Sequence, residues 1–283
     1  MQPEEEKVIY TPYEELADPK FTEDKLNEGY LFIIAQLESD KWKDNYIALE
    51  ELRILNKFYF GYLCTKLEEI DPYIRVHLDS LRSGLLKMSL LFLEELAGSK
   101  TKPSETAIRS ASLKNYLPKQ IPILLMKLLD AKKFIVKEVE VVMECISTIS
   151  CSPEVIITLC EQYFTGISRG TVFADNVMKY LEMGIKAKVN KEIWEECKTQ
   201  IMLTLGQAVD TGRKKMMKEV SSILTTLKKS CGEEIILASI KNTAIPKHEQ
   251  QKLEDLLAGK GEEKKKPDSG FKTFLQGKKN HKA

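Results

Sequence analysis

One stretch of this sequence has the residue types and spacing of a nucleophilic enzyme. Residues 166–170, Gly-Ile-Ser-Arg-Gly, fit the Gly-x-Ser-x-Gly pattern of a nucleophile elbow. That elbow lies between a strand and a helix, and its serine needs acidic and histidine partners later in the chain. Here the preceding residues have helical spacing, and only His248 and His281 follow. We therefore predict a glycine-flanked turn between two helices, and no enzyme activity.

No other pattern for catalysis, metal binding or cofactor binding occurs. The sequence has no glycine-rich phosphate loop and no H-E-x-x-H motif. Its three histidines, His77, His248 and His281, are scattered, and none of its six cysteines forms a Cys-x-x-Cys pair. We expect no metal and no cofactor, and we expect the cysteines to be small buried apolar residues in a reducing compartment.

The apolar spacing predicts helices from Phe21 onward. Leu86, Leu90, Leu93 and Ala97 follow the i, i+4, i+7 pattern, and similar sets recur along the chain. Polar breaks interrupt these helices every 34 to 51 residues. They lie near Lys41, Leu81, Lys132, Arg169, Gly212 and Pro246. HEAT and armadillo units repeat every ~40–47 residues, so we predict an all-α HEAT-repeat solenoid of five to six helix pairs, shaped as a slightly curved paddle.

Composition sets the expected domain boundaries. Residues 1–20 carry six acids and two lysines and should form an extended acidic arm, and residues 21–258 should form the repeat domain. Residues 259–283 hold eight lysines and three acids, and we expect a flexible lysine-rich tail. The segment 98–111 is expected to be a polar loop between the second and third pairs.

The charge balance and apolar content bear on the partners. The net charge of the 283-residue chain is +1, which argues against nucleic-acid binding. No apolar run is long enough for a membrane span, and the acidic N-terminus lacks the apolar core of a signal peptide. We therefore expect a cytoplasmic protein without membrane or nucleic-acid partners.

Basic residues recur at the turns within the pairs. Each turn places Lys or Arg at, or just after, the start of the second helix, where the helix macrodipole favours acids. In a solenoid these turns align along one edge. The pattern predicts a basic ridge suited to an acidic protein surface, although a merely solvated edge would give the same charges.

Trp42 lies in the first of these turns, between Lys41 and Lys43. A tryptophan in a polar turn can cover the core, or it can be exposed and anchor a partner, since Trp and Arg often dominate interfaces. The sequence leaves both readings open. Trp194 and the Met-rich stretches are expected to belong to the core.

Taken in order, these turns resemble those of the TOG domain, the tubulin-binding HEAT array of CLASP, crescerin and the larger microtubule polymerases. The resemblance covers residues 21–258. Its motifs are Trp42 with Ala48-Leu49, Arg82-Ser83, Lys132-Lys133-Phe134-x-Val136, and Arg213 to Lys215. The chain departs from the family at Asn45, where the family often has Arg, and in the fourth turn, which keeps only Arg169.

The resemblance implies binding of αβ-tubulin or the microtubule wall through the turns, without nucleotide chemistry. The implied contact residues are Trp42, Lys43, Arg82, Lys132, Lys133, Lys137, Arg169, Arg213 and Lys214. It also implies a cytoskeletal location, with the axoneme of a cilium or flagellum and its associated proteins as one setting. The alternative is a general HEAT or armadillo scaffold for an acidic partner other than tubulin.

Overall fold

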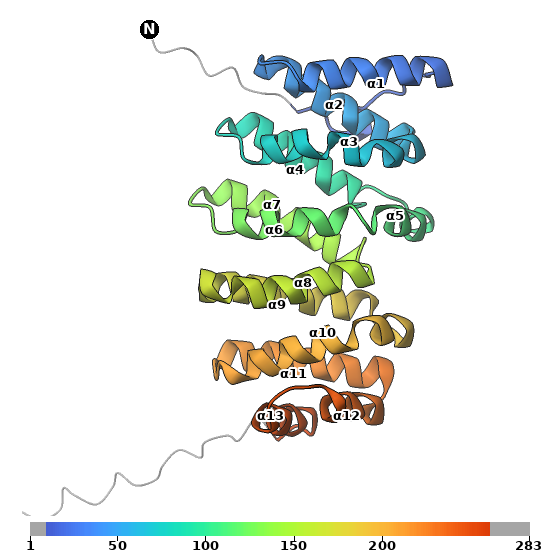
Figure 1. Cartoon of the computed structure of the whole chain (residues 1–283). Coiled ribbons are helices and arrows are strands. Elements are labelled where there is room, and N and C mark those ends of the chain that lie inside the picture. Colours follow the sequence, from blue (N-terminus) through green and yellow to red (C-terminus); the bar gives the residue numbers. More distant parts are fainter. Residues whose placement is uncertain (1–9, 261–283) are drawn as a thin grey trace, which may run out of the picture.

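A computed structural model describes residues 10–260 of the chain. These residues contain thirteen α-helices and no strand. The helices form one stack of layers, with α1 at one end and α13 at the other (Figure 1). Their bounds are α1 Glu23–Leu37, α2 Trp42–Phe58, α3 Phe60–Leu78, α4 Ser83–Leu96, α5 Thr106–Leu113, α6 Leu117–Lys127, α7 Lys133–Thr148, α8 Pro153–Gly166, α9 Thr171–Lys188, α10 Lys191–Asp210, α11 Lys214–Cys231, α12 Glu233–Asn242 and α13 Lys247–Leu257.

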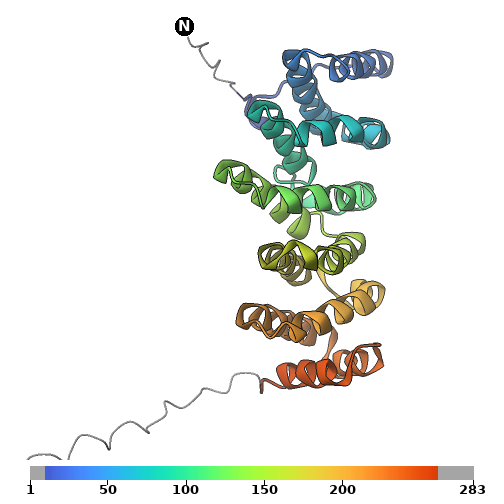
Figure 2. The ribbon, with the colours of Figure 1, turned by 60° about the vertical axis from the view of Figure 1, so that its left-hand side comes forward.

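Twelve of these helices form six pairs, and this confirms the predicted all-α helical-repeat solenoid. The pairs are α1/α2, α3/α4, α6/α7, α8/α9, α10/α11 and α12/α13. The second helices contact one another in series from α2 through α4, α7 and α9 to α11, while α8 contacts α6 and α10 among the first helices. Figure 2, turned by 60°, shows the same layers side on. Each pair thus buries its apolar stripes only against its neighbours.

The expected loop at 98–111 is partly helical, and this prediction was wrong. A 3₁₀ turn at Pro103–Glu105 leads into α5. Arg109 anchors α5 to α2. Its buried guanidinium donates hydrogen bonds to the side-chain and backbone oxygens of Asn56, at 2.8 and 3.0 Å. Most of the segment is exposed, but the buried Arg109 anchors it to α2.

A continuous apolar core runs through the stack. Trp194, as predicted, is a core residue with 1% of its surface exposed. The cysteines are free thiols, five of them buried and Cys64 half-buried, as expected for small apolar residues. Burial raises the pKa of Cys160 to about 12, so this thiol stays protonated. None of the helices in residues 10–260 is both long and apolar enough to cross a membrane.

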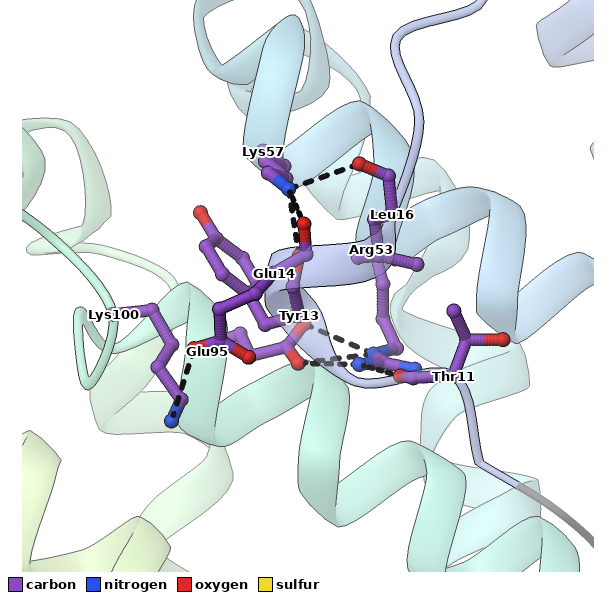
Figure 3. Close-up of polar contacts among 8 residues, drawn as sticks. All are labelled: Thr11, Tyr13, Glu14, Leu16, Arg53, Lys57, Glu95 and Lys100. Carbon is purple, nitrogen blue, oxygen red and sulfur yellow. Dashed lines mark hydrogen bonds and ion pairs between the residues drawn. The ribbon is translucent and has the colours of Figure 1, made fainter.

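Residues 10–20 of the predicted arm lie on the second helices of the first two pairs (Figure 3). Arg53 of α2 forms a fully buried ion pair with Glu95 of α4, with Nη2 2.7 Å from Oε1, and also donates to the Thr11 carbonyl at 2.9 Å. The Lys57 ammonium donates to the carbonyl oxygens of Tyr13, Glu14 and Leu16. Because Leu16 is itself buried, this part of the arm contributes to the core. Residues 1–9 and most of the predicted tail, 261–283, lie outside the described residues.

Candidate functional site

The turns within the six pairs align along one long edge of the solenoid, on the left of Figure 1 for the first five. We call this surface the turn edge; it comprises residues 38–41, 79–82, 128–132, 167–170, 211–213 and 243–246. Side-chain contacts join each turn region to the next. They are Trp42 with Arg82, Asp79 with Lys127, Met126 with Arg169, Thr171 with Arg213, and Asp210 with His248.

Four of these turns share one local structure. A Ser, Thr or Asp side chain accepts a hydrogen bond from the backbone N–H two residues later, and that later residue is a Lys or Arg at the helix N-cap. The pairs are Ser39/Lys41, Ser80/Arg82, Asp130/Lys132 and Thr211/Arg213. Such side-chain-to-backbone bonds fix a turn locally. The sequence thus places a cation at the same position of four turns, and none of the four N-cap side chains caps its own helix.

Trp42 partly covers the core, which is one of the two roles that the sequence left open. Its side chain is half-buried and packs against the core. The Lys43 ammonium lies 5.8 Å from the ring centroid, and the Arg82 guanidinium of the second turn lies 5.6 Å away. The ring therefore covers the core and also joins two turns through cation–π contacts.

Asn45, at the position where the resemblance led us to expect Arg, is buried. Its amide donates to the carbonyl oxygens of Gln36, Ser39 and Lys41, at 3.1, 2.7 and 3.3 Å. These three bonds satisfy the end of α1 and the turn that follows it. Asn45 therefore stabilises the backbone of the first turn as a buried hydrogen-bond donor.

The third turn carries the most exposed positive charge. Lys132, Lys133 and Lys137 are all exposed. Within residues 10–260, no carboxylate lies within ion-pair distance of these three ammonium groups. Their charges are thus available to an acidic partner.

The fourth and fifth turns differ from this pattern. Arg169 is exposed and contacts the Met126 sulfur, with its guanidinium 5.3 Å from the Phe173 ring. Arg213 is half-buried and paired with Asp175 of α9, so its charge is largely compensated. Lys214 is exposed, and no carboxylate of the described residues pairs with it.

Acidic side chains occur on the same edge. They are Asp40 and Asp44 at the first turn, Asp79 at the second, Asp130 at the third and Asp210 at the fifth. Asp44 accepts from the Ser39 hydroxyl, and Asp79 pairs with Lys127 at 2.9 Å. The first two turns are therefore nearly neutral, and the positive charge is concentrated at the third and fifth.

Exposed apolar side chains gather on the middle of the turn edge, and none of them is among the contact residues that the resemblance implies. Of the thirteen large apolar side chains that are exposed in residues 10–260, seven lie in or within one helical turn of the second, third and fourth turns. They are Val76, Leu81, Met126, Leu129, Phe134, Phe164 and Val172. Leu81 is 93% exposed and Val172 is 60% exposed. The available signal was an apolar residue inside a polar turn, as in Ser80-Leu81-Arg82.

No family model matches the chain, and no curated protein matches it. Among solved structures, it is similar to a designed armadillo repeat protein, with 12% identity and a TM-score of 0.34, over 81% of this chain and 98% of the other. It is also similar to one of a set of computationally designed armadillo repeat proteins for modular peptide recognition, with 12% identity and a TM-score of 0.41, over 80% of this chain and 97% of the other. Both TM-scores are low, so the helical-repeat description rests on the six stacked pairs themselves.

Proposed function

We propose that this chain is a non-catalytic binding module that docks an acidic protein partner along its turn edge. One observation carries the proposal: the exposed apolar side chains and the unpaired lysines of the third turn lie on the same edge. Contiguous exposed apolar surface with a charged rim is typical of protein interfaces. The apolar centre would supply affinity, and the lysines would speed association with a negative surface.

The finer proposal is that the partner is αβ-tubulin or the microtubule wall. It is supported by the resemblance of the turns to those of TOG domains, at Trp42, Arg82, Lys132 and Lys133. It would place the protein on the cytoskeleton, with the axoneme as one setting. The lysine-rich residues 259–283 would add a second, salt-sensitive attachment to an acidic surface.

The second candidate is a scaffold for an acidic protein other than tubulin. It is favoured by the compensation of Arg213 by Asp175, which leaves the fifth turn less basic than the TOG-like pattern would require. Both candidates use the same edge. Only the identity of the partner separates them.

The test of the tubulin proposal is a pair of binding assays, microtubule co-sedimentation and gel filtration with free tubulin. Leu81→Asp places a negative charge at a nearly fully exposed position, so it should abolish binding without lowering the melting temperature. Trp42→Ala should weaken binding by ~2 kcal/mol, as for an interfacial tryptophan. It should also cost some stability, because the ring partly covers the core.

The lysines are tested with a matched control. Lys132→Ala with Lys133→Ala should slow association and flatten the salt dependence, at a cost of less than ~1 kcal/mol per lysine. Lys25→Ala with Lys229→Ala removes the same charge from two exposed residues at helix ends away from the turns. Equal weakening by both pairs would show that only bulk charge matters. Binding of neither tubulin nor microtubules would reject the tubulin proposal and leave the general scaffold.

A further inference from the structure

A cluster of possible metal ligands joins the last two helix pairs. Asp210 is the final residue of α10, and His248 and Glu249 lie in the first turn of α13. His248 Nε2 is 3.1 Å from Asp210 Oδ1 and 4.0 Å from Glu249 Oε1. One donor atom from each residue lies within 4.8 Å of the other two. The three residues can therefore converge on one ion with small side-chain adjustments.

The packing of α13 on α10 fixes Glu249 at this point. A β-carbon on Gly206 would lie 2.8 Å from Glu249 Oε2, so glycine is what allows the carboxylate to approach α10 so closely. Glu249 is only 9% exposed. Within residues 10–260, its carboxylate accepts no hydrogen bond, and its Oε1 lies 4.0 Å from the His248 imidazole. The carboxylate is thus held beside the His248 imidazole with its capacity to coordinate a ligand largely unused.

The local electrostatics favour a cation. The negative C-terminal end of α10 and the positive N-terminal end of α13 meet here and offset each other, so the two carboxylates supply the attraction for a cation. The Lys252 ammonium also faces these carboxylates, 3.5 Å from Asp210 Oδ1.

We propose that Asp210, His248 and Glu249 bind a divalent transition-metal ion of the zinc type. One imidazole nitrogen and two carboxylate oxygens suit Zn²⁺, with water in the fourth position, better than they suit Mg²⁺, which prefers an all-oxygen set. The ion would displace the Lys252 ammonium and tie α13 to α10. Because His248 must be neutral to bind, affinity should fall as the imidazole becomes protonated.

The site also bears on the turn edge, since Asp210 directly precedes the fifth turn and His248 closely follows the sixth. A bound divalent ion would neutralise the negative charges of Asp210 and Glu249 at this end of the edge. The metal proposal does not depend on the identity of the partner.

The test uses the full chain with zinc chloride as the probe, followed by calorimetric titration and thermal unfolding. We expect one saturating equivalent of zinc and a melting temperature that rises by ~5 °C at a hundredfold excess over the dissociation constant. His248→Ala and Asp210→Asn should each weaken binding at least ~10-fold and remove that rise. Both side chains are more than half exposed, so the metal-free melting temperature should be unchanged.

Two matched variants exclude other ligands. His281→Ala removes a histidine of the tail, and Cys64→Ser removes the only cysteine that is not buried; neither should change the zinc affinity. Magnesium chloride should give no comparable rise. The proposal is overturned if zinc does not saturate at millimolar concentration, or if the His248 and Asp210 variants bind zinc as tightly as the unaltered chain.

Discussion

Replacing Glu95 with Gln should destabilise the N-terminal half of the solenoid strongly. The Arg53–Glu95 pair lies between α2 and α4, and 1% or less of either side chain is exposed. Three Arg53–Glu95 hydrogen bonds, of 3.1, 3.0 and 2.7 Å, join the guanidinium to the carboxylate. Gln keeps the volume but removes the charge, so the guanidinium stays buried without a counter-ion.

The magnitude follows from what Arg53 retains. In the Glu95→Gln variant, the guanidinium keeps two acceptors, the new amide oxygen and the Thr11 carbonyl. Its Nη1 has no hydrogen-bond partner even with Glu95 in place. Leaving one member of a buried pair unpaired costs ~3–5 kcal/mol. Replacing both members by apolar residues of similar size, Arg53→Met with Glu95→Met, removes the buried charges together. The double variant should therefore lose only ~1 kcal/mol of stability, mainly through the missing hydrogen bond to the Thr11 carbonyl.

The measurement is urea unfolding of the full chain followed by far-ultraviolet circular dichroism, with hydrogen exchange of the α2 and α4 amides to localise the loss. Glu95→Gln should lower the free energy of unfolding by ~3–5 kcal/mol, and the double variant should regain most of it. The reasoning is refuted if the double variant is no more stable than Glu95→Gln. It is equally refuted if Glu95→Gln lies within ~1 kcal/mol of the unaltered chain.

Three further predictions concern other parts of the chain. Burial, together with Asp175 and other nearby carboxylates, raises the pKa of Glu219 to about 7 despite Lys215 and Arg213. Because the folded state binds this proton more tightly than the unfolded state does, Glu219 makes the stability fall as the pH rises from about 4.5 to about 7. Glu219→Gln should reduce that slope in melting curves taken from pH 4 to 8. Gly166→Ala should lower the free energy of unfolding by ~1–3 kcal/mol, because the new β-carbon would lie 1.9 Å from the Phe173 ring. Gly29→Ala is the control, since its β-carbon would lie at ordinary contact distance from Phe21, and it should stabilise α1 by ~0.5–1 kcal/mol in the same urea assay. Removing residues 261–283 should leave the melting temperature unchanged and weaken attachment to an acidic partner most at low salt; a much lower melting temperature would show that the tail belongs to the fold.

The helix pairs could be predicted because their signal is local. Apolar spacing marks each helix, and the breaks at Lys41, Lys132 and Gly212 coincide with turns between helices. Helix α5 could not be predicted in this way, because its charged Arg109 is buried by contacts with residues distant in the sequence, Asn56 of α2 and Phe60 of α3. Its local composition describes a loop, and its tertiary partner makes it a helix.

The turn edge was only partly accessible from the sequence. The alignment of basic turns follows from the repeat, so Arg82 and Lys132 could be placed on one edge in advance. The exposure of Leu81 had a local signal, an apolar residue inside a polar turn. That Asp175 compensates Arg213 and that Asp210 meets His248 depend instead on contacts between neighbouring pairs. Such contacts join residues about forty positions apart, and no local pattern encodes them.

The contacts along the turn edge each cross a single boundary between neighbouring helix pairs. Trp42 reaches Arg82 and Asp210 reaches His248, but none of the contacts described there spans two boundaries. Bending of the stack can therefore be distributed as small changes at every boundary between pairs, without the loss of any one contact. Its curvature can adapt to the spacing of the binding sites on a partner. A rigid partner that bound several turns at once would restrict bending along the whole solenoid.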